Sequence, residues 1–488
     1  MKNNQDAAPL FNALVNYGLK SGATPFDVPG HKFGKAIPQA FKDAVGENIF
    51  KLDVNSMKEL DSLSNPIGVI AEAEQLAAEL FGAENAFFLV NGSTSGVQQM
   101  ILSVCGDHDK LIMPRNAHKS TYNALVLSGA HPVYLEPHND DESGVSMGVT
   151  LQSVKQALDM HPDAKALFLL HPTYFGYTQS LKAIIDLAHR RNVPVLVDQS
   201  HGSHFSLHEA FPPSAMALGA DMATISMHKT GGSLTQSSIL LHQGTRIKKS
   251  YVRSTINVFQ TSSASYLLLA SLDIARRQLA LEGQERFTTL LDQVNAVRSR
   301  IAALPGLEVL GTERLNGDSA FDFDPTKITV DVSAYGVSGF KAYDYFKANH
   351  NVQLELGESH VVLAVAAIGD DEEAFERLYQ ACKGFTNDFT LNHKTTPRKI
   401  GVHMPEMVYT PRNAFFLPSA LVKLEQSEGL ISADSIMVYP PGVPLVVPGE
   451  RVTARTIQDY RFLEQEGNVL IGAHQRDDGI YINVLASA

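Results

Sequence analysis

Short apolar runs alternate with helix-periodic segments between about residues 66 and 198, and this alternation constrains the fold more than any other feature. The apolar runs have the length and composition of buried strands. They are AFFLV, KLIMP, PVYLE, KALFLL and VPVLV. Helix-length segments such as IGVIAEAEQLAAELFGAE and LKAIIDLAHRR lie between them. Because strands that alternate with helices are typical of a parallel sheet, the sequence predicts a doubly wound α/β domain.

Breaks in this pattern divide the rest of the chain. We expect an N-terminal segment over 1–65, a large domain over 66–290, a smaller α+β domain over 291–388 and a C-terminal segment over 389–488. The small domain is predicted from strand-like TKITVDVS, VQLEL and HVVLAVA and from helical GFKAYDYFKANH and DEEAFERLYQACKGF. We interpret NDFTLNHKTTPRK (387–399) as a linker and expect the final segment to pack back on the body.

Charge and cysteine content exclude several classes of partner. The 52 acidic residues outnumber the 40 basic ones, which leaves a formal charge of -12 without a Lys/Arg-rich run. Such a surface repels nucleic acid and anionic lipid, so we expect neither as a partner. Cys105 and Cys382 lack the spacing of a zinc site or a disulfide framework, and no stretch of eighteen apolar residues occurs. We therefore expect a soluble, cytoplasmic protein.

The segment TISMHKTGGSLTQSS (224–238) places a lysine just beyond a buried strand. A solvated lysine at the start of a loop is the ordinary interpretation, because lysine is seldom buried without a partner. Here, however, Ser226 and His228 offer donors for a phosphate, and Gly231 adds flexibility. The pattern suits a phosphorylated aldehyde cofactor attached to Lys229 as a Schiff base.

Other strand ends carry residues that suit the same cofactor. NGSTSG exposes backbone N–H groups and the hydroxyls of Ser93, Thr94 and Ser95 at a helix start, which is an anion site, although glycine and serine also make ordinary turns. Asp198 ends VPVLVD, and its carboxylate can pair with a protonated pyridine nitrogen. His118 in RNAHKS could stack on the ring, or it could cap a helix or lie exposed.

Together these residues resemble the Orn/Lys/Arg decarboxylase family, pyridoxal-phosphate enzymes of fold type I (aminotransferase-like) architecture. The segment SMHKTGGSLTQSS is similar to the family's cofactor-attachment motif, and the resemblance covers nearly the whole chain. It is greatest to the shorter, Gram-positive-type members, which lack an N-terminal receiver-like wing. Further matching segments are FDVPGHK, LDSLSNPIGVIAEAE, FFLVNGSTSG, MPRNAHKS, HPTYFG, TSSASYLLLASLD and YPPGVPLVVPGE.

The resemblance implies a role for each candidate residue. Lys229 would form the Schiff base, Asp198 would pair with the pyridine nitrogen, and His118 would stack on the ring. His201 would lie beside the ring and the substrate, and either His201 or Lys229 would protonate the α-carbon. The implied cofactor-binding residues are Ser93, Thr94, Ser95, Ser226 and His228. The implied activity is decarboxylation of a basic L-amino acid in polyamine synthesis, with arginine first and lysine or ornithine second.

One short segment departs from the family. Where the family usually reads Asp-Glu-Ala-His-Gly, this chain reads Asp198-Gln199-Ser200-His201-Gly202. The acidic neighbour is gone, and a hydroxyl replaces a small apolar residue. We expect the change to affect substrate choice and ring electronics more than cofactor binding.

The substrate's distal cation needs a carboxylate at the far end of the pocket. Glu450 in VPGE is the favoured candidate, with Glu355, Glu358 and Asp27 as alternatives, and each could equally be a surface carboxylate. The resemblance also implies a homodimer or larger assembly, because the family's cofactor lies at a subunit interface. TSSASY (261–266) is the candidate crossing segment.

Three other interpretations remain. Asp198, His201 and His204 have a D-x-x-H-x-x-H spacing that could bind a metal, but a fourth ligand is not obvious, so we predict no metal. Another fold type I reaction, such as transamination or aldol cleavage, would keep the same lysine and aspartate. A non-catalytic regulator that retains the fold is the alternative outside enzymology.

Overall fold

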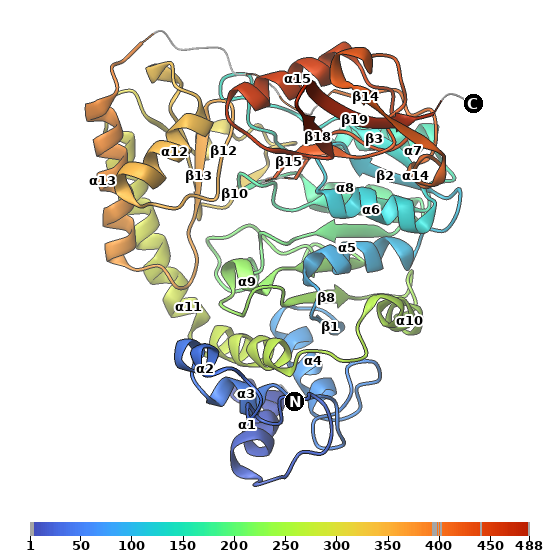
Figure 1. Cartoon of the computed structure of the whole chain (residues 1–488), viewed down its shortest axis with the longest axis vertical. Coiled ribbons are helices and arrows are strands. Elements are labelled where there is room, and N and C mark those ends of the chain that lie inside the picture. Colours follow the sequence, from blue (N-terminus) through green and yellow to red (C-terminus); the bar gives the residue numbers. More distant parts are fainter. Residues whose placement is uncertain (1–3, 393–397, 399, 401–402, 440–441, 487–488) are drawn as a thin grey trace. The chain divides into compact units, whose positions relative to one another are not determined.

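The computed structural model describes residues 4–392, 398, 400, 403–439 and 442–486 (Figure 1). Most of the predicted linker's second half and two residues of YPPGVPLVVPGE therefore lie outside the described residues. The chain divides into two compact units. The first unit comprises Met1–Ser103 and Val197–Phe287, and the second comprises Val104–Leu196 and Thr288–Ala488.

The largest sheet has seven strands in the order β1-β8-β7-β6-β4-β2-β3. In the second unit β2 is parallel to both β3 and β4, and in the first unit β8 is antiparallel to both β1 and β7. The predicted mostly parallel sheet is confirmed. Its strands are β1 (Asn85–Leu89), β2 (Lys110–Pro114), β3 (His131–Leu135), β4 (Ala166–Leu170), β6 (Val195–Asp198), β7 (Met222–Ile225) and β8 (Ser238–His242).

Helices of the first unit follow directly from its strands. Strand β1 leads into α5 (Gly92–Leu102), and β7 leads into the short α9 (Met227–Thr230). Helix α5 also packs closely against β7. Gly96 on α5 allows this approach, since a Cβ there would lie 2.3 Å from Thr224 Oγ1 on β7. The other helices of this unit are α1 (Pro9–Val15), α2 (Gln39–Val45), α3 (Asn48–Leu52), α4 (Val69–Leu80) and α10 (Lys249–Phe259), and α11 (Tyr266–Ala302) begins in it.

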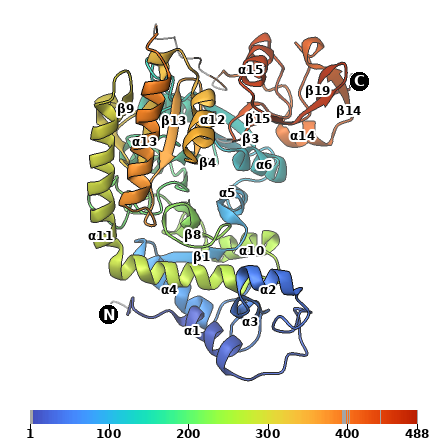
Figure 2. The same ribbon diagram turned by 60° about the vertical axis from the view of Figure 1, so that its left-hand side comes forward.

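The N-terminus of α1 is capped by a residue that lies far away in the sequence. Ala8 at the N-cap position offers no side-chain acceptor. Instead, Asp273 Oδ2 on α11 accepts the N–H groups of Leu10 and Phe11 at 3.0 and 3.1 Å, and Arg276 beside it donates to backbone carbonyls of the same segment. Asp273 thus satisfies backbone N–H groups that a helix N-terminus leaves without partners. Figure 2 shows α1 and α4 together beside β1.

The second unit carries smaller antiparallel sheets. One has the strand order β12-β13-β11-β9, and α12 packs against its strands β12 and β13, which matches the predicted α+β domain (Figure 2). The strands of this sheet are β9 (Glu308–Leu310), β11 (Lys327–Asp331), β12 (Leu356–Gly357) and β13 (Val361–Val365). A separate two-stranded sheet pairs β5 (Tyr177–Thr178) with β10 (Asp322–Phe323). The helices are α6 (Lys119–Ser128), α7 (Leu151–Met160), α8 (Leu181–Arg190), α12 (Gly339–His350) and α13 (Glu372–Asp388).

The last part of the second unit has a core of its own. Buried Leu445, Val446, Tyr460 and Ile482 pack together there, while α14 packs against α6 of the same unit. Its helices are α14 (Pro411–Phe416) and α15 (Ala454–Gln465). Its strands are β14 (Ser419–Lys423), β15 (Ile436–Val438), β16 (Pro444–Val446), β17 (Leu470–Ile471), β18 (Ala473–Arg476) and β19 (Gly479–Leu485).

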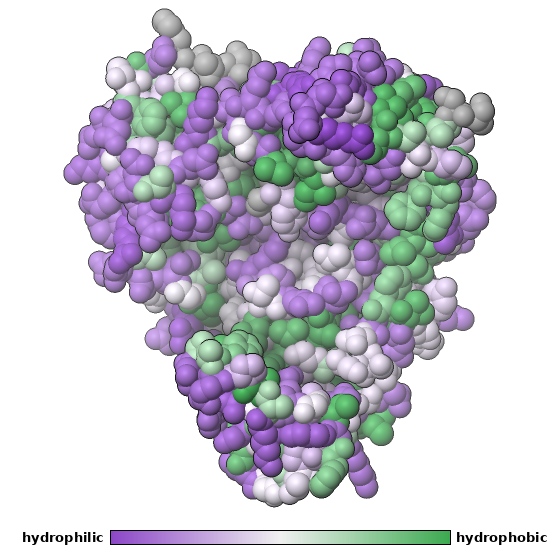
Figure 3. All heavy atoms as spheres, in the orientation of Figure 1, coloured by the Kyte–Doolittle hydropathy of each residue, from purple (hydrophilic) through white to green (hydrophobic). Residues whose placement is uncertain are grey.

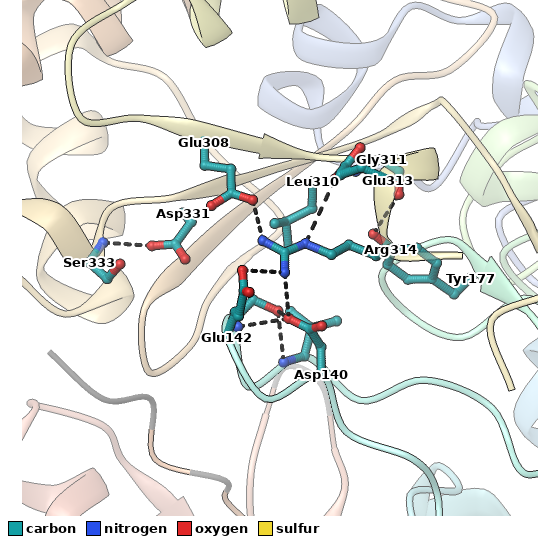
Figure 4. Close-up of polar contacts among 12 residues, drawn as sticks. Asp140, Glu142, Tyr177, Glu308, Leu310, Gly311, Glu313, Arg314, Asp331 and Ser333 are labelled. Atoms are coloured by element: carbon teal, nitrogen blue, oxygen red, sulfur yellow. Dashed lines mark hydrogen bonds and ion pairs between the residues drawn. The ribbon is translucent and has the colours of Figure 1, made fainter. Parts of the chain in front are cut away.

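Arg314 holds a loop of the second unit against β9 (Figure 4). Its guanidinium donates to Glu142 at 2.6 Å and to Glu308, and it lies 3.6 Å from Asp140. The acidic side chains thus surround the guanidinium of Arg314, and they do not line an open binding site. Among the described residues, the helices are too short or too polar to cross a membrane.

Candidate functional site

The candidate lysine is positioned by the turn from β7 into α9. The backbone N–H of Lys229 donates to Ser226 O at 3.1 Å, which starts the short helix. The lysine Nζ then lies 2.6 Å from His201 Nε2. At this distance the two nitrogens form a hydrogen bond. The structure thus brings together the two residues expected to act on the α-carbon.

Thr230 fastens α9 to the loop that carries His201. Its Oγ1 lies 2.5 Å from Ser203 Oγ and 3.2 Å from His204 Nδ1. The imidazole of His204 also packs edge-on against Phe211, with ring centroids 4.4 Å apart. This environment suits a structural histidine. No group of three metal-binding side chains is arranged to hold a metal ion within the described part of the chain.

An anion cradle forms at the N-terminus of α5. The hydroxyl of Ser226 donates to Ser93 Oγ at 2.8 Å, and Ser93 in turn donates to Ser238 at 3.3 Å. Ser95 caps locally by donating to Gly92 O at 2.9 Å, whereas Thr94 is exposed. The first backbone N–H groups of an eleven-residue helix and the helix dipole favour a phosphate at this position.

The glycine-rich loop after Lys229 closes over the same helix end. Gly92, in the left-handed region with φ of 68°, donates its N–H to Gln236 O at 2.8 Å. His228 donates from Nδ1 to Ser237 O at 2.9 Å. Burial lowers the pKa of His228, the bond to Ser237 raises it, and the charge of Lys229 lowers it, with a net downward shift. The downward shift favours the neutral imidazole.

The two carboxylate oxygens of Asp198 differ in their hydrogen bonds. Its Oδ1 accepts the backbone N–H of Ser200 at 3.0 Å and the Ser200 hydroxyl at 2.5 Å. Among the described residues Oδ2 has no hydrogen-bond partner, and the side chain is half-buried. This oxygen can accept a hydrogen bond from a protonated ring nitrogen.

Gln199, the other departure from the family, is a structural brace. Its amide donates to Gly202 O at 2.8 Å and accepts the N–H of Ala215 at 2.7 Å, and only 3% of the residue is exposed. Its own backbone N–H donates to Thr224 O at 3.0 Å. Gln199 therefore holds the loop below Asp198.

His118 belongs to the second unit and caps α6. Its Nδ1 accepts the backbone N–H of Ser120 at 3.2 Å, and its ring meets Tyr439 edge-on at a centroid distance of 6.1 Å. Helix capping was the ordinary alternative considered for this residue.

The position of Glu450 corrects the expectation for the substrate's distal cation. Glu450 and Arg115 are both fully buried and form an ion pair at 3.0 Å. Glu450 Oε2 also accepts the N–H of Val447 at 2.9 Å, and Arg115 donates to Tyr122 at 2.8 Å. The carboxylate is thus used in the core of the second unit and is not open to a substrate.

The other candidate carboxylates differ in their surroundings. Glu355 is half-buried and accepts a hydrogen bond from the Tyr174 hydroxyl at 2.5 Å, so its orientation is fixed. Glu358 is half-buried, and burial raises its pKa to about 7. Asp27 is exposed.

Sequence reasoning missed two residues that hold the structure around these candidates. Thr230 lies within the segment SMHKTGGSLTQSS and Arg115 lies within MPRNAHKS, and both segments carried the resemblance.

Solved structures similar to this chain define its class. The lysine decarboxylase LdcF of Francisella novicida matches with a TM-score of 0.86 at 21% identity, over 98% of this chain and 81% of that chain. The ureidoglycine-glyoxylate aminotransferase of Bacillus subtilis matches with a TM-score of 0.53 at 14% identity, over 66% of this chain and 86% of that chain. The fold is that of the fold type I pyridoxal-phosphate enzymes, which confirms the predicted fold class.

Sequence comparison defines the family. The model of the Orn/Lys/Arg decarboxylase major domain matches residues 8–374, and that of the C-terminal domain matches 394–484. A Bacillus subtilis arginine decarboxylase is 40% identical over 456 residues, 93% of each chain. The lysine decarboxylase LdcA of Pseudomonas aeruginosa is 24% identical over 93% of this chain and 75% of that protein. This chain belongs to the Orn/Lys/Arg decarboxylase family, which confirms the predicted class of enzyme.

Proposed function

We propose that the protein binds pyridoxal 5'-phosphate and converts arginine to agmatine and carbon dioxide, with lysine or ornithine as the alternative substrate. The observation that carries this proposal is the 2.6 Å contact between Lys229 Nζ and His201 Nε2, in the same unit as the anion cradle and Asp198. The relatives named arginine decarboxylase, at about 40% identity, favour arginine over the other basic amino acids.

The residues of the first unit fit the cofactor. The cradle formed by Ser93, Ser226 and the start of α5 suits its phosphate, Lys229 suits its aldehyde, and the open oxygen of Asp198 suits its pyridine nitrogen. When bound, pyridoxal phosphate supplies an electron sink for the pair released when the bond from the α-carbon to the carboxylate breaks.

Residues of this chain would manage the protons of the reaction. Asp198 holds a proton at the ring nitrogen, where its negative charge keeps the ring positively charged. Either His201 or Lys229 would then deliver a proton to the α-carbon, and this proton replaces the departed carboxylate. Ser95, Thr94 and His228 stay in the proposal as neighbours of the phosphate, and His118 as the stacking histidine.

Glu355 is the carboxylate that we now favour for the distal cation. The Tyr174 hydroxyl fixes its orientation, so less side-chain freedom is lost when a guanidinium binds. Two parallel N–H donors of arginine would then meet two carboxylate oxygens, a geometry that an ammonium cannot reproduce.

Absorbance spectroscopy and product analysis test the function. The protein reconstituted with pyridoxal phosphate should absorb visible light, lose that band with borohydride, and lack it in Lys229→Ala. Incubation with arginine, lysine and ornithine separately should give agmatine as the fastest product. Cadaverine or putrescine as the faster product would change the substrate, and no amine at all would favour a non-catalytic regulator.

We further propose a homodimer or larger assembly, located in the cytoplasm and serving polyamine synthesis. Apolar side chains of the first unit are unusually exposed: Phe26 (94%), Ile67 (84%) and Val258 (78%). Figure 3 shows hydrophobic residues at the surface of the N-terminal helices. In the candidate crossing segment, residues 261–263 are exposed. Both cysteines are buried and unpaired, which suits a reducing compartment. A protein that sediments as a fully active monomer would refute the proposed assembly.

A further inference from the structure

Two donors of one residue converge on one oxygen of Asp198. Both the backbone N–H and the hydroxyl of Ser200 donate to Oδ1, at 3.0 and 2.5 Å. Ser200 is 8% exposed, so water competes little for either bond. A hydrogen bond to a charged acceptor is stronger than one between neutral groups, and two donors on the same oxygen oppose rotation of the carboxylate.

The backbone below these donors is also fixed. The neighbouring Gln199 is tied to Thr224, Gly202 and Ala215 by three hydrogen bonds. The Ser200 hydroxyl is therefore presented from a rigid loop. An alanine at this position would keep the backbone donor but would have no hydroxyl, so the second bond depends on the serine side chain.

We propose that Ser200 is a positioning residue, which holds Asp198 with Oδ2 directed to the ring nitrogen of the cofactor. The inference rests on the proposed function, since Asp198 must meet pyridoxal phosphate for the positioning to matter. Without the hydroxyl the carboxylate rotates more freely and pairs less well with the ring nitrogen. With the cofactor bound, weaker pairing at Asp198 would reduce the positive charge on the ring, and the Lys229 nitrogen would hold its proton more tightly.

The experiment compares Ser200→Ala, Ser200→Thr and a matched control, Ser206→Ala, in the loaded enzyme. Ser206 is exposed on the same loop. The first readout is the pH midpoint of the change in the cofactor's visible absorbance. In Ser200→Ala we expect it to rise by about half a pH unit or more. We expect kcat to fall about three- to tenfold with KM little changed. Ser200→Thr keeps a hydroxyl and should retain the wild-type midpoint, as should Ser206→Ala.

The outcomes separate this inference from the function on which it rests. An unchanged or lower midpoint in Ser200→Ala, beside a wild-type protein that decarboxylates, would overturn the positioning role alone. A pH midpoint that rises as far in Ser200→Thr as in Ser200→Ala would also overturn the positioning role. A wild-type protein without visible absorbance would overturn the proposed function and this role with it. A purely structural role would lower the melting temperature and leave the midpoint where it is.

Discussion

The hydroxyl of Ser226 lies 2.8 Å from the hydroxyl of Ser93, although 133 residues separate the two in the chain. Ser226 follows β7 and Ser93 begins α5, so the contact joins two strand ends of the first unit. It places the lysine motif beside the helix N-terminus that suits a phosphate. The candidate phosphate cradle and the candidate Schiff-base residue thus lie in the same unit.

Replacing Asp198 by alanine should separate cofactor binding from turnover. The phosphate cradle and Lys229 are untouched, so we expect affinity for pyridoxal phosphate to fall modestly. We expect kcat to fall by about two to three orders of magnitude, since the ring charge matters most in the transition state. Steady-state kinetics and cofactor titration measure both, with exposed Asp43→Ala as the control. Near-normal turnover would refute the assignment.

Gln199→Leu should reduce stability and spare the chemistry. The substitution leaves Gly202 O and Ala215 N without their partners in a buried loop, at a cost of about 1–3 kcal/mol each. Denaturant unfolding measures the loss against the exposed control Gln152→Leu. We expect kcat per folded molecule to stay within about twofold, because the side chain faces the loop. A large loss of kcat without a loss of stability would contradict the bracing role.

Glu450→Ala should destabilise the second unit. It leaves the buried Arg115 without a counter-charge, which costs about 3–5 kcal/mol. Exposed Glu428→Ala serves as the control in chemical denaturation. The milder Glu450→Gln keeps an acceptor for Val447 and should leave KM for arginine unchanged. A KM raised tenfold or more in a Glu450→Gln protein of normal stability would restore the substrate role expected from the sequence.

Glu358→Gln should stabilise the protein progressively as the pH rises above about 4.5. Burial raises the pKa of Glu358 in the folded state to about 7, above the ordinary value of 4.5 that the unfolded chain has. The folded protein therefore holds the proton more tightly, and ionisation of Glu358 costs stability progressively between pH 4.5 and 7. Glutamine removes that cost. Melting temperatures should coincide below pH 4.5 and diverge up to about pH 7, while Glu428→Gln should show no such trend.

Sequence reasoning succeeded where the signal is local. The strand before NGSTSG and the strand before SMHK are short apolar runs, and each is followed by the helix start that its small and polar residues favour. It failed for Glu450, because the residue that buries this carboxylate, Arg115, lies 335 positions away. A Pro/Gly-rich segment with a charge looks like a surface loop until its counter-charge is known. The capping role of His118 was only one of several local alternatives.

The cap that Asp273 provides for α1 also sets an order of events during synthesis. Leu10 leaves the ribosome 263 residues before its partner does. At about 5–20 residues per second, the first turn of this helix waits roughly 13–50 s for the acceptor that completes it. During that interval the segment exposes Leu10 and Leu14, which are buried in the finished protein. Until translation reaches α11, the start of the nascent chain therefore lacks the acceptor that completes this helix end.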